Sequence, residues 1–172
     1  MNTIDEINKL SQSEFVEIFG NIFEKARWIA EKLYNEKPFN NFEELRSKML
    51  EIFINASKEI QIKVLNAHPD LADKTKIGSL ATDSKIEQNN AGLNRCFTEE
   101  FNEFKNLNNK YKKKFGFPFI LAVKGRDKIE ILNEFKKRIL NNKNDEFGEA
   151  LIQVVKIANL RLKEFNMKKI NL

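Results

Sequence analysis

Apolar side chains recur at intervals of three and four residues along most of the chain. This is the period at which an α-helix presents one face to a core. The clearest stripe runs from Leu93 to Tyr111, and Gly116 just beyond it favours a helix end. The stripes predict helices over residues 13–37 (continuous, or restarting near residue 24), 42–53, 57–67, 84–115, 127–140 and 145–165.

Only one segment, Phe117–Val123, is continuously apolar, and Pro118 within it disfavours a central strand. A lone strand has no partner in this sequence, so we expect a buried extended segment. The 172 residues include six glycines and three prolines, and they contain no repeat or low-complexity linker. Together these features predict an all-α fold, with a single compact multi-helix domain over residues 1–172.

Charge and hydropathy narrow the class of protein. The formal net charge of +5 suggests nucleic-acid binding, but basic residues cluster only within residues 110–114 and at 168–169. Elsewhere they alternate with acidic residues, so a solvated surface of mixed sign is favoured. No apolar run approaches the roughly 20 residues of a membrane-spanning helix, and residues 1–15 lack the pattern of a secretory signal. We therefore expect a cytoplasmic protein without a nucleic-acid or membrane partner.

The chain has one cysteine, Cys96, and one histidine, His68. A lone cysteine forms no intramolecular disulfide and no Cys-rich zinc site, which favours a reducing compartment. With so few nitrogen and sulfur ligands, a tight transition-metal site is not expected. Cys96 lies within a predicted helix and is expected to be a buried structural residue. Any reaction that needs a protein imidazole must use His68.

Two polar groups stand out against the apolar pattern. His68 precedes Pro69 at a predicted helix end, where it is either a structural histidine beside the helix dipole or a functional group. Ser84 and Glu87 have the Ser-x-x-Glu spacing of a capping box, in which each side chain satisfies a backbone N–H of the helix start. With Gln88, the same arrangement could bind an anion or a small polar ligand. Both interpretations remain open for both groups.

Arg161 is a third candidate, because it follows Ala150, Val154 and Ile157 along one face of the last predicted helix. A guanidinium on an apolar face must be paired within the fold or must meet an anion that enters it. The alternative is an arginine whose aliphatic stem packs on the helix while its charge reaches solvent.

Several of these residues belong to sequence blocks that recur together in one family. The blocks are His68-Pro-Asp-Leu-Ala, Ser84-x-x-Glu87-Gln88-x-x-Ala91-Gly92-Leu93, Lys114-Phe-Gly-Phe-Pro-Phe-Ile120, Ala122-Val-Lys-Gly125, Glu146-Phe-x-x-Ala150-Leu151 and Ile157-Ala-Asn-Leu-Arg161-Leu162. In this order they resemble the 2-oxo-4-hydroxy-4-carboxy-5-ureidoimidazoline (OHCU) decarboxylases of urate breakdown. The resemblance covers nearly the whole chain and is strongest over residues 60–162.

The resemblance implies an all-α, cofactor-free and homodimeric carboxy-lyase that converts OHCU to (S)-allantoin and carbon dioxide. It assigns His68 as the catalytic proton donor, Glu87 as a catalytic residue that orients the substrate, and Arg161 as a substrate-binding residue. The other substrate-binding positions that it implies are Pro69, Ser84, Gln88 and the segment Phe119, Ile120, Leu121, Ala122 and Val123. It implies no metal.

The chain departs from the family pattern in one loop. Asp73 stands where many members have glycine, and the stretch between His68 and Ser84 is about one residue short. These departures bear on the path of the loop more than on the chemistry. Two alternatives remain: a basic helical module that binds nucleic acid or protein, and a family member that has lost its activity.

Overall fold

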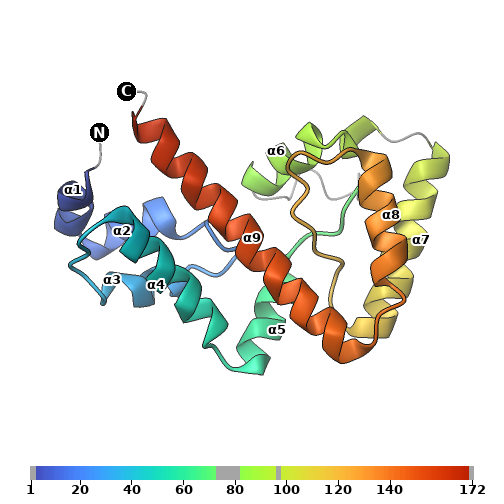
Figure 1. Cartoon of the computed structure of the whole chain (residues 1–172), viewed down its shortest axis with the longest axis horizontal. Helices are drawn as coiled ribbons and strands as arrows, with labels where there is room; N and C mark the ends of the chain where they lie inside the picture. Colours follow the sequence, from blue (N-terminus) through green and yellow to red (C-terminus); the bar gives the residue numbers. More distant parts are fainter. Residues whose placement is uncertain (1–2, 73–81, 96–97, 171–172) are drawn as a thin grey trace. The chain divides into compact units, whose positions relative to one another are not determined.

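The computed structural model describes residues 3–72, 82–95 and 98–170 (Figure 1). These residues form helices joined by turns, and no strand occurs among them, which confirms the predicted all-α fold class. They group into two compact units, which we describe one at a time. Unit 1 comprises residues 1–64 and 155–172, and unit 2 comprises residues 65–154. The single domain expected over residues 1–172 stays a prediction.

Unit 1 is built from short helices near the N-terminus and the end of the last helix. They are α1 (Ile4–Lys9), α2 (Gln12–Phe19), α3 (Trp28–Tyr34), α4 (Phe42–Ile54), most of α5 (Lys58–Ala67) and the end of α9 (Lys143–Ile170). Ser11, rather than Ser13, caps α2 through a capping box with Glu14. The first predicted helix therefore starts earlier, ends at Phe19, and restarts as α3.

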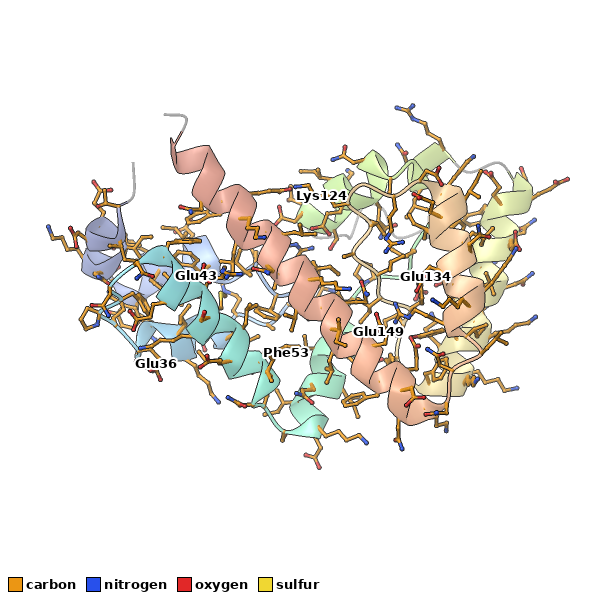
Figure 2. All side chains as sticks on the ribbon, in the orientation of Figure 1. Glu36, Glu43, Phe53, Lys124, Glu134 and Glu149 are labelled. Carbon is orange, nitrogen blue, oxygen red and sulfur yellow. The ribbon has the colours of Figure 1, made fainter. Side chains whose placement is uncertain are left out.

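The core of unit 1 is largely aromatic. The ring centroids of Phe15 and Phe19 lie 4.6 Å apart. Phe53, on α4, is fully buried, and its ring lies 5.1 Å from that of Phe23 (Figure 2). Phe19 also contacts Phe165 at 5.0 Å, which fastens the end of α9 to α2. The predicted apolar stripes supply these residues, so α9 is held in unit 1 by burial of rings.

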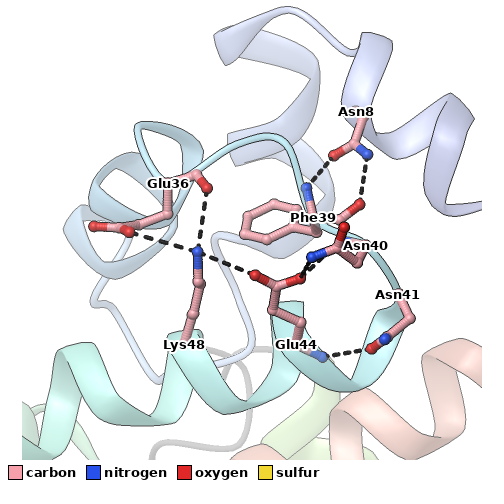
Figure 3. A network of polar contacts seen from close by, with 7 residues as sticks. All are labelled: Asn8, Glu36, Phe39, Asn40, Asn41, Glu44 and Lys48. Carbon is pink, nitrogen blue, oxygen red and sulfur yellow. Dashed lines mark hydrogen bonds and ion pairs between the residues drawn. The ribbon is translucent and has the colours of Figure 1, made fainter.

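Polar contacts fix the turn between α3 and α4 (Figure 3). The side chain of Asn8 accepts from the N–H of Phe39 and donates to its carbonyl, at 2.9 and 2.8 Å. Glu44 accepts from both the backbone and side-chain nitrogens of Asn40 at 2.8 Å. Lys48 lies 3.3 Å from the same carboxylate. These contacts satisfy the backbone N–H and carbonyl of Phe39 and the backbone N–H of Asn40.

Unit 2 begins at the end of α5 and contains α6 (Thr82–Asn90), the 3₁₀ helix η2 (Leu93–Arg95), α7 (Thr98–Phe115), α8 (Lys128–Arg138) and the first part of α9. The helix predicted from residue 84 to residue 115 is wrong as a single element. It breaks after Asn90, where Gly92 adopts φ +76°, and α7 begins at Thr98. Cys96 and Asp73 lie outside the described residues.

The segment Phe117–Val123 lies outside any helix and is buried except for the half-buried Ala122, as predicted. Gly116 has φ +84°, a conformation that glycine adopts without strain, and it turns the chain out of α7 into this segment. The ring of Phe119 stacks on that of Phe135 of α8 at 3.9 Å, and α7 packs against α8 (Figure 1). The segment is therefore held inside unit 2 by aromatic packing.

Candidate active site

His68 follows the last residue of α5 directly, and its backbone N–H donates to the carbonyl of Leu65 at 3.2 Å. His68 and Pro69 are both half-buried. The predicted position at a helix end is therefore correct. It accords with both interpretations of His68, because a residue at a helix end feels the dipole and also begins a turn.

The loop that follows His68 and Pro69 is fastened by Gln88 of α6. The Gln88 side-chain oxygen accepts from the N–H of Ala72 at 3.0 Å, and its nitrogen donates to the carbonyl of Asp70 at 3.4 Å. Gln88 is only 8% exposed. Its amide therefore holds residues 70–72, which we call the histidine loop. From the sequence, Gln88 was predicted to contact substrate, and this structural role was not predicted.

Two residues of α7 hold the same loop, and sequence reasoning missed both. The Asn108 side chain donates to the carbonyl of Leu71 at 2.9 Å. The Lys112 ammonium lies 2.6 Å from a carboxylate oxygen of Asp70. Their spacing of four residues places both on one face of α7. A polar Asn108 on the otherwise apolar side of α7 was the available signal, but nothing in the sequence identified its partner.

Ser84 and Glu87 both lie within α6. The helix starts at Thr82, so Ser84 stands inside its first turn and is not the N-cap, and the capping-box interpretation is wrong. Ser84 is buried and Glu87 is half-buried. Ser84, Glu87 and Gln88 are spaced three and four residues apart, so they share one face of α6. That face also carries the contact to the histidine loop.

Unit 2 fixes the segment Phe119–Val123 through two backbone groups. The carbonyl of Ile120 accepts from Arg138 Nη1 at 2.6 Å, and the N–H of Ala122 donates to the Gln153 side chain at 3.0 Å. Gln153 in turn donates to Glu149, on α9, at 2.6 Å (Figure 2). These two backbone groups are therefore occupied by the protein itself.

Arg138 belongs to a buried polar cluster beneath this segment. Its Nε and Nη2 lie 3.0 and 2.5 Å from one carboxylate oxygen of Glu146, which also accepts from the Tyr111 hydroxyl. The guanidinium lies 4.6 Å from the ring of Phe119. Burial, and then the hydrogen bond to Glu146, raise the pKa of Tyr111, so the phenol stays protonated. The cluster therefore holds the segment through the Ile120 carbonyl and the Phe119 ring, both of which contact Arg138.

Arg161 belongs to unit 1 and is 6% exposed. Its Nη1 donates to the carbonyls of Asn21 and Ile22 at 3.3 and 3.2 Å. The same nitrogen lies 3.6 Å from a carboxylate oxygen of Glu24, whose side chain is 2% exposed. The solvent-directed alternative is therefore wrong, and the guanidinium is paired inside the fold, which is one of the two outcomes that the apolar face predicted.

The structure thus joins Gln88 of α6 to the loop that begins at His68 and Pro69, all within unit 2. The segment Phe119–Val123 belongs to the same unit, where Tyr111 of α7 contacts Phe119 at 5.4 Å. Among the described residues, no cluster of acidic, histidine or cysteine side chains could hold a metal ion. Within the same described residues, every helix is either too short or too polar to span a membrane.

Comparison with known proteins places the chain in a family. The family model described as OHCU decarboxylase matches residues 8–163. The 2-oxo-4-hydroxy-4-carboxy-5-ureidoimidazoline decarboxylase of Haloferax volcanii is 38% identical, over 94% of this chain and 95% of that protein. The uric acid degradation bifunctional protein of Bacillus sp. (strain TB-90) is 42% identical over 95% of this chain, which spans only 32% of that longer protein.

Solved structures agree with this placement. The crystal structure of an (S)-allantoin synthase superposes with a TM-score of 0.75 at 28% identity, covering 95% of this chain and 54% of that one. The resemblance seen in the sequence blocks is confirmed by the match over residues 8–163, which contains every candidate site residue. The chain belongs to the OHCU decarboxylase family.

Proposed function

We propose that this protein decarboxylates OHCU to (S)-allantoin and carbon dioxide in urate breakdown, without a cofactor. The observation that carries the proposal is the family match over residues 8–163, within which the only histidine of the chain stands in a turn fixed from two helices. The relatives that are named for this reaction are matched over nearly their whole length, as in the Haloferax volcanii enzyme.

The chemistry explains why no cofactor is needed. Decarboxylation breaks a C–C bond and leaves an electron pair, for which many enzymes recruit an electron sink such as pyridoxal phosphate. In OHCU a ring C=N adjoins the carbon that bears the carboxylate. The pair forms a C=C bond to the neighbouring carbon, and the C=N electrons move onto nitrogen, which is protonated. The hydroxyl then becomes the carbonyl of allantoin, while the carbon that bears the ureido group gains a proton.

The protein must therefore orient the carboxylate, stabilise the developing charge and deliver the proton to one face. We assign proton delivery to His68, because an imidazole is the side chain best suited to general acid catalysis near neutral pH. Glu87, half-buried on α6, would accept hydrogen bonds from the ureido or ring N–H groups. Arg161 and the backbone of Phe119–Val123 would hold the anionic and carbonyl oxygens.

Two backbone groups of the segment Phe119–Val123 are already bound within the protein, which limits the groups that can contact the substrate. Because the Ile120 carbonyl and the Ala122 N–H bind Arg138 and Gln153, we assign the substrate contact to other backbone groups of the segment. Ser84, Gln88 and Pro69 would line the site beside the histidine loop. Donors fixed in advance by the fold need little reorganisation when charge develops.

Arg161 offers a test of substrate binding that spares the fold. Arg161→Lys keeps a positive charge beside the buried Glu24 but loses the planar fork that binds a carboxylate at two points. We expect KM to rise about tenfold and the unfolding midpoint to stay close to that of the wild type, in steady-state kinetics and thermal unfolding. Arg46→Lys is the matched control in unit 1, because Arg46 pairs with Glu43 instead. Equal KM values for both variants and the wild type would remove Arg161 from the substrate site.

The quaternary state and location are also proposals. We propose a homodimer, because the family resemblance implies one. We propose a cytoplasmic location, because the single cysteine of the chain forms no intramolecular disulfide and suits a reducing compartment.

The activity is tested with OHCU generated in situ from urate by the two enzymes that precede it. Disappearance of OHCU and release of carbon dioxide are followed with and without this protein. We expect acceleration in proportion to protein concentration, with one carbon dioxide per OHCU consumed. No acceleration over spontaneous decay would instead support the alternative of a family member that lost its activity.

A further inference from the structure

The three residues after the His68–Pro69 turn are each bound by a side chain from another helix. Asp70 and Ala72 are bound by Gln88, as described above, and Asp70 is bound a second time by Lys112. Leu71 is bound by Asn108. Because residues 70–72 are each held in this way, the adjoining turn has little freedom, and so His68 has little freedom either.

The contacts from α7 are not explained by stability. The Lys112 side chain is 40% exposed, and ion pairs so accessible to water contribute little to folding. Asn108 is 5% exposed, and its Oδ1 has no hydrogen-bond partner among the residues that the structure describes. A buried acceptor without a partner is costly. An apolar side chain at this position would avoid that cost. The asparagine therefore contributes through the hydrogen bond that it donates to the carbonyl of Leu71.

The conformation of the loop also needs external support. Ala72 has φ +58°, in the left-handed region that residues with a side chain rarely occupy. Such a conformation persists only where neighbouring groups over-determine it, and it is found at sites where geometry matters for function. The Gln88 and Asn108 contacts to Ala72 and Leu71 supply that support.

We propose that Asn108 and Lys112 are positioning residues that hold the His68 imidazole in its reactive orientation. The inference rests on the proposed function, in which His68 donates the proton. Asn108 and Lys112 act through the loop and not through contact with substrate. We therefore expect their loss to lower kcat rather than to raise KM. Misplacement of a reacting group by ~1 Å costs on the order of 10²-fold in rate, which leaves room for a measurable loss.

The test uses three lysine variants of the full chain. Lys112→Met removes the bond to Asp70, Lys112→Arg retains a cation there, and Lys113→Met removes the same charge from the next, exposed position of α7. We expect Lys112→Met to lower kcat about tenfold with KM within about twofold of the wild type. Lys112→Arg should restore kcat to within about twofold, and Lys113→Met should leave it unchanged.

A second readout does not need activity. Because His68 is the only histidine, its ring C–H groups give the only imidazole signals in the NMR spectrum. Lys112→Met should shift or broaden them, whereas Lys112→Arg and Lys113→Met should not. Asn108→Asp, which keeps the side-chain shape but removes the donor to Leu71, should resemble Lys112→Met.

The outcomes separate the two proposals. An active wild type with Lys112→Met and Asn108→Asp equal to it in kcat and in the His68 signals overturns the positioning role alone. A loss that Lys112→Arg fails to restore, or that Lys113→Met shares, overturns it as well. A wild type that does not accelerate the decay of OHCU removes the proposed function, and the positioning role in catalysis falls with it.

Discussion

His68→Asn is expected to abolish catalysis while leaving the fold intact. Asparagine has a planar side chain that can still donate a hydrogen bond, but it neither gives up nor takes a proton near neutral pH. Loss of a general acid costs typically 10²–10⁴-fold, and we expect kcat to fall by about that factor. The measurement is the rate of OHCU disappearance with the purified variant under the conditions of the wild type.

The same variant carries its own control. The N–H of His68 donates to the carbonyl of Leu65 through the backbone, so this bond does not depend on the side chain. The loop that follows is held by Gln88, Asn108 and Lys112, none of which is changed. The far-UV circular dichroism and the unfolding midpoint should therefore match those of the wild type. Full catalytic rate in this variant would show that the proton comes from elsewhere.

Of the substitutions proposed for this protein, Arg138→Met is expected to lower the free energy of unfolding the most. The Arg138 and Glu146 side chains are 2% and 0% exposed, so the change leaves a carboxylate buried without its cation. It also leaves the carbonyl of Ile120 without its donor. Breaking one side of a buried pair costs about 3–5 kcal/mol. For a chain of this size that lowers the melting temperature by about 10 °C, measured by thermal unfolding.

The double variant Arg138→Met/Glu146→Gln separates charge from packing. It removes the buried negative charge but keeps a side-chain oxygen to accept from the Tyr111 hydroxyl. We expect it to recover part of the lost stability, because the unpaired charge is the costly element. An Arg138→Met protein within about 1 kcal/mol of the wild type would contradict the role given to this cluster.

The helices could be predicted where a stripe of apolar residues coincides with clear capping signals. Asp127, predicted to open a helix, caps α8 with a capping box, and Gly116 ends α7 as expected. The first helix, α1, was missed, although Thr3 and Glu6 form a capping box. It is six residues long, which is too short for the apolar period to register. Gly92 was not recognised as a break, because a glycine inside a helical pattern is only weakly unfavourable.

The sequence indicated which polar residues would stand out from the apolar pattern, but not which groups they bind in the fold. The apolar face of α9 indicated that Arg161 must be paired or must meet an anion, but Glu24 lies 137 positions away in the sequence and no local rule connects the two. The same holds for Gln88 and Asn108, whose amides bind the backbone of residues 70–72. Bonds from side chains to distant backbone leave no periodic pattern, because any residue can supply the carbonyl.

On the proposed function, this protein directs both the decarboxylation of OHCU and the protonation that follows it. Without the protein, a proton reaches both faces of the planar intermediate equally, so the allantoin formed by spontaneous decay is racemic and has no circular dichroism. The decisive measurement follows circular dichroism after OHCU is generated from urate in the presence of the protein. We predict rapid appearance of the signal of (S)-allantoin at a rate set by protein concentration. Racemic allantoin that accumulates no faster than without the protein would contradict it.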